Sequence, residues 1–183
     1  MAEQEYTFTD EDLEKIEEIK SQFPNDKAAT LRALWVAQRK FGHVKPEVQK
    51  LVADTLDLPR AHVHGVASFY TQYYKEEMGK FVLDVCTCLS CQVCGAYDIL
   101  EYIEEKLDIK AGETTEDGMF SIQEVECLGA CGYAPMLQVS NDVYANNLTK
   151  EKVDELIENL RDGKMPEFES MVMRQNKKRQ ENL

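Results

Sequence analysis

The segment Lys80–Ile109, KFVLDVCTCLSCQVCGAYDILEYIEEKLDI, decides the fold of this 183-residue chain. Its first part, KFVLDVC, is a short β-rich run that ends at Cys86, and residues 96–109 repeat apolar side chains at helical spacing. Residues 86–94 contain four cysteines and connect the predicted strand to the predicted helix. Because loops at strand ends commonly carry functional sites, we expect one here.

A second cysteine pair follows another predicted strand. Residues 119–127, MFSIQEVEC, end at Cys127, and Cys131 comes four residues later. A hairpin is predicted over residues 136–145 and a last helix over 149–161. The order of elements is therefore β-α-β-β-α, with both cysteine groups at the ends of strands.

The chain before this region is predicted to be helical. Thr9 is a suitable cap for a first helix, and Gly42 suits the end of a second. Pro46 and Pro59 are well placed to open a third and a fourth. We therefore predict an α+β fold with three parts: an all-helical bundle over residues 1–77, an α/β domain over 78–165 and a polar tail over 166–183.

Charge and hydropathy exclude two classes of function. A net charge of -13 and a pI near 4.7 argue against nucleic-acid binding, which needs a concentrated basic face. No apolar run reaches the length of about 18 residues that marks a membrane span. The first residues, MAEQEYTFTDEDLEK, are acidic where a targeting peptide is basic. We therefore expect a cytoplasmic chain without direct membrane insertion.

In a reducing compartment, the 6 cysteines suit metal binding or redox chemistry better than a disulfide framework. Their spacings fit three iron–sulfur patterns. Cys88, Cys91 and Cys94 match the opening of a bacterial four-iron motif, but the Cys-Pro that should follow is missing. Cys86, Cys91 and Cys94 match the plant-type two-iron spacing, with a distant fourth cysteine.

The third pattern takes one pair from each strand-end loop: Cys86 with Cys91, and Cys127 with Cys131. It is mildly favoured, because two loops held by neighbouring strands can supply two thiolates to each iron of a two-iron cluster. Spacing alone leaves the choice open. A structural zinc bound by four thiolates is a further alternative.

Two other interpretations use the remaining motifs. Cys91 and Cys94 are spaced like a thioredoxin dithiol, but the second cysteine pair argues against a dithiol oxidoreductase. A Rieske centre would need two histidine ligands, and His43, His62 and His64 all lie far from the cysteine loops in sequence. We expect His62 and His64 to serve in helix packing or at the surface.

Residues 85–144, from VCTCLSCQVCG to VSNDVY, resemble the thioredoxin-like [2Fe-2S] ferredoxin subunit of NADH:quinone oxidoreductase, respiratory complex I. The resemblance extends back through LRALWVAQRKFGHVKPEVQK and covers residues 31–166. It implies that the α/β domain is thioredoxin-like and that one [2Fe-2S] cluster is bound by four cysteines. Carried over by motif position, these cofactor-binding and metal-ligating residues are Cys86, Cys91, Cys127 and Cys131.

The resemblance also implies partners. They are a flavoprotein subunit that binds NADH and FMN and holds a [4Fe-4S] cluster, and further subunits of the peripheral arm of complex I. The cluster would exchange single electrons with that FMN, and the chain would have no catalysis of its own. Its expected location is the cytoplasmic side of the inner membrane, as a peripheral part of the complex. Alternatives are the equivalent subunit of an NAD-linked hydrogenase or formate dehydrogenase, or a stand-alone ferredoxin.

Two further expectations concern particular residues. Ala134-Pro135 is expected to form the cis-proline loop that thioredoxin-like folds place beside their site. Docking on the flavoprotein is expected to use exposed aromatic side chains of the helical region, and ordinary core packing is the alternative role of each. The aromatic candidates are Trp35, Phe69, Tyr70, Tyr73 and Tyr74.

Overall fold

The computed structural model describes residues 6–167 of the chain. The chain divides into two compact units, Met1–Met78 and Gly79–Leu183, one residue after the division predicted from the sequence. Of the predicted polar tail, all residues from 168 onward lie outside the described part.

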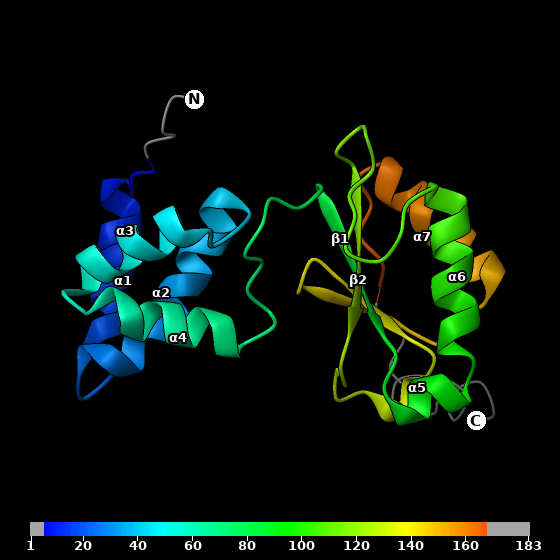
Figure 1. The fold of residues 1–183 in the computed structure, drawn as a ribbon, viewed down its shortest axis with the longest axis horizontal. Helices are drawn as coiled ribbons and strands as arrows, with labels where there is room; N and C mark the ends of the chain where they lie inside the picture. Colours follow the sequence, from blue (N-terminus) through cyan, green and yellow to red (C-terminus); the bar gives the residue numbers. More distant parts are fainter. Residues whose placement is uncertain (1–5, 168–183) are drawn as a thin grey trace, which may run out of the picture. The chain divides into compact units, whose positions relative to one another are not determined.

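The first unit is built from four helices: α1 (Asp10–Ser21), α2 (Asp26–Phe41), α3 (Pro46–Leu56) and α4 (Arg60–Phe69) (Figure 1). Local signals set their ends, since Pro46 is the first residue of α3 and Gly42 ends α2 in the left-handed conformation, with φ 78°. The apolar stripes of the helices meet in one core, whose members include Ile16, Ala33, Leu34, Val52, Leu56, Val63 and Tyr73.

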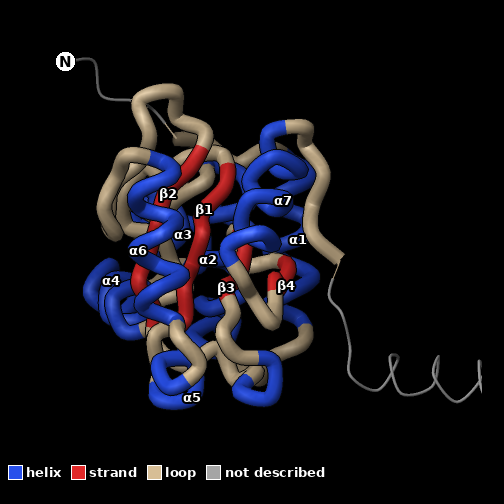
Figure 2. The backbone as a smooth tube through the Cα atoms, turned by 90° about the vertical axis from the view of Figure 1, so that its right-hand side faces the viewer, coloured by secondary structure: helices blue, strands red, loops and turns tan. Residues whose placement is uncertain are grey.

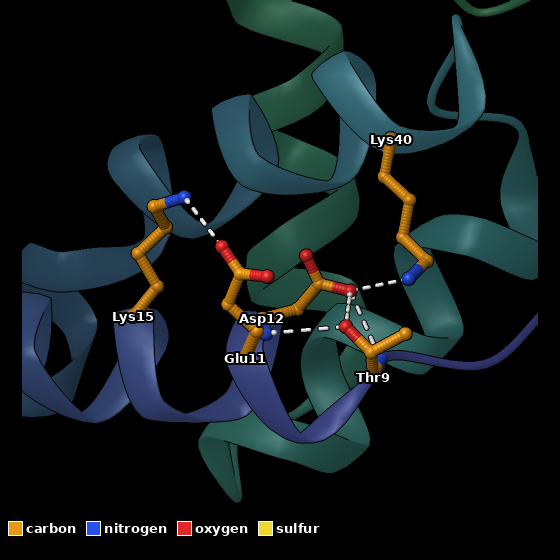
Figure 3. A network of polar contacts seen from close by, with 5 residues as sticks. All are labelled: Thr9, Glu11, Asp12, Lys15 and Lys40. Carbon is orange, nitrogen blue, oxygen red and sulfur yellow. Dashed lines mark hydrogen bonds and ion pairs between the residues drawn. The ribbon is translucent and has the colours of Figure 1, made fainter.

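A network of polar contacts fixes the start of α1 (Figure 3). The Thr9 side chain accepts a hydrogen bond from the backbone N–H of Asp12, and the Asp12 carboxylate accepts one from the backbone N–H of Thr9 at 2.9 Å. Lys40 of α2 forms an ion pair with the same carboxylate. The capping box therefore also joins two helices.

The second unit contains one four-stranded sheet. Its strands lie in the order β2-β1-β3-β4. β1 is parallel to β2 and antiparallel to β3, and β3 pairs with β4 as a hairpin. The strands are β1 (Phe81–Cys86), β2 (Phe120–Val125), β3 (Leu137–Val139) and β4 (Val143–Ala145).

Helices α6 (Ala96–Leu107) and α7 (Lys150–Arg161) cover one face of this sheet, as Figures 1 and 2 both show. Their apolar faces pack on the inward side chains of the strands. This core includes Leu83, Val85, Ile103, Phe120, Ile122, Leu137, Val153 and Leu160. A β-α-β-β-α order was predicted, and the structure adds a short helix α5 (Leu89–Val93) before α6 and a 3-10 turn η1 (Cys131–Tyr133) before β3.

α5 contains Cys91 and η1 begins at Cys131, so both additions shape the cysteine loops that the sequence pattern left undefined. Within residues 6–167, none of the helices combines the length and the apolar character that crossing a bilayer requires.

Candidate functional site

The sheet brings the two cysteine groups together. β1 ends at Cys86, and Cys127 comes two residues after the end of β2, not at the strand end as predicted. In the parallel register Cys86 lies opposite Val125, so the loops after β1 and β2 leave the sheet at the same end. α5 lies at that end of the sheet in Figures 1 and 2. Loops far apart in sequence are thereby placed side by side.

A pocket opens between these loops. It holds about 180 Å³, counting the space at its mouth, and all its ionisable groups are thiols. The lining residues are Cys86, Cys88, Ser90, Cys91, Cys127, Ala130, Cys131 and Met136. The four cysteines predicted as ligands are therefore all present, together with Cys88.

The thiols lie in pairs. The Sγ atoms of Cys127 and Cys131 are 3.8 Å apart. Two sulfurs that each lie about 2.3 Å from one tetrahedral metal ion are separated by roughly this distance, about 3.8 Å. Cys86 and Cys91 are hydrogen-bonded to each other and are both buried, whereas Cys127 and Cys131 are exposed. One pair therefore faces the interior and the other faces solvent.

The exposed pair is held by a tight turn. Gly129, with φ 76°, donates its backbone N–H to the Cys127 Sγ at 3.4 Å. This hydrogen bond, and a further one with Cys131, hold the pKa of the Cys127 thiol below its usual value. Tyr144 of β4 donates its hydroxyl to the Leu128 carbonyl at 3.0 Å, so the sheet anchors the turn.

The buried pair has a different environment. Burial raises the pKa of the Cys91 thiol to about 12, and the hydrogen bond with Cys86 acts in the same direction, while a backbone hydrogen bond from Met136 opposes it. The Cys86 backbone N–H in turn donates to the Met136 carbonyl at 3.1 Å. Without a metal, Cys91 is therefore held as a neutral thiol.

The sequence of this chain matches that of a known protein family. Residues 16–161 match the family described as thioredoxin-like [2Fe-2S] ferredoxin. The chain belongs to this family. The match spans both compact units, so the helical unit is part of the family's sequence as well as the cysteine-bearing unit.

Relatives of this ferredoxin include two bacterial proteins of similar length, both named as parts of an NADH-quinone oxidoreductase. The one from Rhizobium meliloti is 40% identical over 148 residues, which are 81% of this chain and 88% of the relative. The one from Thermus thermophilus, NADH-quinone oxidoreductase subunit 2, is 38% identical over 159 residues, 86% of this chain and 88% of the relative.

Among solved structures, an NAD+-reducing [NiFe]-hydrogenase in the H2-reduced state is similar to the ferredoxin with a TM-score of 0.60. The sequence identity is 17%, and the alignment covers 73% of this chain and 22% of that chain. At this identity the likeness concerns the fold alone. It agrees with helices followed by a thioredoxin-like domain.

The two cysteines outside the predicted ligand set differ in position. Cys88 lines the pocket and is hydrogen-bonded with Cys127. Cys94, at the end of α5, is exposed and is not among the lining residues of the described chain. Spacing could not separate them, because α5 decides which cysteine turns inward. Among the described residues, 6–167, no group of three or more His, Cys, Asp or Glu side chains is arranged to hold a single metal ion.

Two other sequence expectations can be compared with the structure. The Ala134-Pro135 bond is cis, as predicted, and lies between η1 and β3. Each histidine hydrogen-bonds within the helical unit: His43 with Tyr6, His62 with Thr30 and His64 with Gln49. His62 is half-buried and His64 is exposed, which agrees with the packing or surface role expected of these two.

Proposed function

We propose that this chain is an electron-transfer subunit of an NADH-quinone oxidoreductase and holds one [2Fe-2S] cluster. The observation that carries the proposal is one pocket lined by two thiol pairs from separate loops, in a member of a [2Fe-2S] ferredoxin family. When bound, the cluster accepts and releases one electron at a time.

The proposed ligands are Cys86, Cys91, Cys127 and Cys131. The donor set suits the cluster, because all four are soft sulfur ligands and the two loops each supply the two thiolates that one iron needs. The 3.8 Å separation of the Cys127 and Cys131 sulfurs supports one of these pairs. Cys88 also lines the pocket, where it is hydrogen-bonded with Cys127, and we propose that it is not a ligand.

The chain's own residues shape the environment of the bound group. The Gly129 N–H donates to the Cys127 sulfur and favours its charged form. Met136, with 1% of its surface exposed, excludes water from the side of the buried pair. The open side leaves a route for electrons to and from another protein.

The expected partner is a flavoprotein subunit that binds NADH and FMN and carries a [4Fe-4S] cluster, and further peripheral-arm subunits complete the complex. The names of the relatives, which are subunits of NADH-quinone oxidoreductases, support this assignment. The chain would contribute no independent catalysis. It would lie peripherally on the cytoplasmic side of the inner membrane.

The test is metal and sulfide analysis combined with electron paramagnetic resonance (EPR) of the dithionite-reduced protein. The wild type is compared with a Cys88→Ser/Cys94→Ser double variant at matched concentration. We expect two irons and two sulfides per chain in both proteins and the same spin-half signal, because neither replaced residue is a ligand.

Other outcomes have definite meanings. Zinc without sulfide would replace the cluster by a structural metal site. Loss of the signal in the double variant alone would move a ligand to Cys88 or Cys94. The parent complex is identified by the activity that co-purifies with the chain: NADH-dependent quinone reduction supports the proposal, and hydrogen- or formate-dependent NAD+ reduction contradicts it.

A further inference from the structure

We propose that the surface around α5 is the docking face for the electron-transfer partner, and that this partner presents an apolar centre surrounded by lysine and arginine side chains. We call this surface the α5 face and define it by Leu89, Val93, Tyr97, Glu124 and Glu126. The inference rests on the proposed function, because the pocket beside this face is the proposed cluster site.

The centre of the α5 face is apolar and exposed. Leu89 and Val93 have 72% and 79% of their surface exposed, the largest fractions for aliphatic side chains of the described residues. They are four residues apart on α5, so they lie on the same side of the helix. Cys91, which lines the pocket, lies about 200° round the same helix from Leu89. The apolar pair is therefore on the outer side of α5 and the pocket is on its inner side. An apolar surface of this kind beside a functional pocket indicates an interaction site.

The rim of the α5 face is acidic. Glu124, at the end of β2, accepts hydrogen bonds from the Thr87 hydroxyl at 2.9 Å and from the Tyr97 hydroxyl at 3.2 Å. Its carboxylate is therefore held between the cysteine loop and the start of α6. Glu126 adjoins Cys127 and is also exposed. The sequence contains no lysine or arginine from residue 81 to 105 or from 111 to 149, the stretches that supply both loops.

These charges define the partner. The negative charge of four thiolates and two sulfides exceeds the positive charge of two irons, so a bound cluster would add negative charge beside the acidic rim. A partner that covers this surface must therefore supply positive charge. Interfaces commonly combine an apolar centre with a charged rim, and opposite charges on the two rims speed association. Because the pocket lies against the inner side of the same short helix, a protein bound to the α5 face is separated from the proposed cluster by about one helix diameter, roughly 10 Å.

The test measures NADH-driven reduction of the cluster by the purified flavoprotein subunit of the same complex, followed by stopped-flow absorption at several salt concentrations. Leu89→Ser/Val93→Ser removes the apolar centre. Glu124→Gln/Glu126→Gln removes the rim charge but keeps an acceptor oxygen for Thr87 and Tyr97. The matched control is Glu101→Gln/Glu105→Gln, which removes two exposed charges from α6.

We expect the apolar variant to reduce the second-order rate constant about tenfold or more, as for a central interface pair. The rim variant should be slower at low salt and should lose much of the salt dependence, while the control keeps wild-type behaviour. Wild-type rates in both face variants would overturn the inference. A truncated chain that ends at Glu167 gives a second test. If it loses the salt dependence, the basic segment 174–179 causes that dependence and the inference is overturned.

Failure of the proposed function is recognised separately. Each variant is first checked for iron, sulfide and a dithionite-reduced EPR signal. A chain without a cluster contradicts the proposed function before docking is measured, whereas an intact cluster with unchanged transfer rates contradicts only the assignment of the α5 face.

Discussion

At the scale of single residues, Asp12 shows how one carboxylate joins two helices. It accepts hydrogen bonds from the Thr9 backbone and hydroxyl, at 2.9 Å and 2.7 Å, and forms the ion pair with Lys40. Partial burial would raise its pKa, but the Lys40 and Thr9 interactions outweigh that effect and lower the pKa to about 2. The charged form is therefore the one that the fold stabilises.

This residue should make the helical unit sensitive to acid. Since the pKa of Asp12 is lower in the folded state than its ordinary value of 3.8, its contribution is present above about pH 4 and is lost as the pH falls towards 2. Asp12→Asn should lower the free energy of unfolding at pH 7 and flatten its decrease over this range. Urea titrations at several pH values, followed by Trp35 fluorescence, measure this free energy of unfolding. As a control, Glu14→Gln on the same helix should keep the wild-type dependence on pH.

A second prediction at this scale concerns the turn that carries Cys127. Tyr144→Phe removes the hydroxyl that anchors the Leu128 carbonyl, at a cost of about 1 kcal/mol. We expect the variant to lose its visible absorption to an iron chelator several times faster than the wild type. Tyr102→Phe is the matched control, because its hydroxyl donates to Asp154 at 2.8 Å, between α6 and α7. If the Tyr144→Phe and Tyr102→Phe variants lose the absorption at equal rates, the hydrogen bond from Tyr144 to Leu128 does not protect the cluster site.

At the scale of elements, Gly79 lets the chain just before β1 lie directly against the backbone at the start of β2. A Cβ atom at this position would lie 2.8 Å from the backbone carbon of Phe120, the first residue of β2. The Gly79 N–H also donates to the Ser121 hydroxyl at 2.7 Å. A side chain at residue 79 would therefore push β1 and β2 apart where their pairing begins.

Gly79→Ala should destabilise the second unit by about 1–3 kcal/mol, since backbone atoms cannot move aside as a flexible side chain can. Loss of the cluster's visible absorption on heating reports this. Gly65→Ala is the opposite case, because Gly65 is exposed in α4 and has open space around it. It should stabilise the helical unit by about 0.5–1 kcal/mol, measured by Trp35 fluorescence. A stable Gly79→Ala protein would mean that the strands can separate without cost.

The sequence predicts elements better than it predicts their neighbours. Thr9, Gly42 and Pro46 act on adjacent backbone, so the ends of the first three helices follow from them. The order β2-β1-β3-β4 depends on pairings between residues far apart in the chain, which no local pattern contains. For the same reason, spacing alone could not decide among the cysteine patterns or place Cys88 in the pocket.

The aromatic candidates for docking show a similar limit. Tyr73 has 1% of its surface exposed and donates its hydroxyl to the Leu31 carbonyl, so it is a core residue. Phe69, four residues earlier, has 78% exposed and lies edge-on to Tyr70. Both are aromatic residues in one short segment, and only the packing of α4 and the chain after it separates their roles.

At the scale of the whole molecule, the cysteine pocket draws all its residues from the second unit. The strands, α5 and η1 that shape it lie after residue 78. The helical unit has a separate core, formed by its own four helices together with Val44 and Tyr73. We therefore propose that the two units fold independently and that only the second binds the cluster.

A chain that starts at Gly79 tests this division. We expect it to contain the same iron and sulfide as the full chain and to give the same EPR signal after reduction, because every proposed ligand and its hydrogen-bond partners are retained. The complementary fragment, residues 1–78, should be helical by circular dichroism. Cluster loss in the first fragment would show that the helical unit supports the site.

The exposure of Leu89 and Val93 also bears on the life of the chain in a cell. A copy that has found its partner hides these side chains, whereas a surplus copy displays them beside reactive sulfur atoms. Exposed apolar surfaces without their partner are aggregation liabilities, and chaperones and proteases continuously remove aberrant chains from the cell. Overproduced without its partner, this protein should therefore be short-lived or aggregate, and the cell would maintain the ratio of subunits by removing the excess.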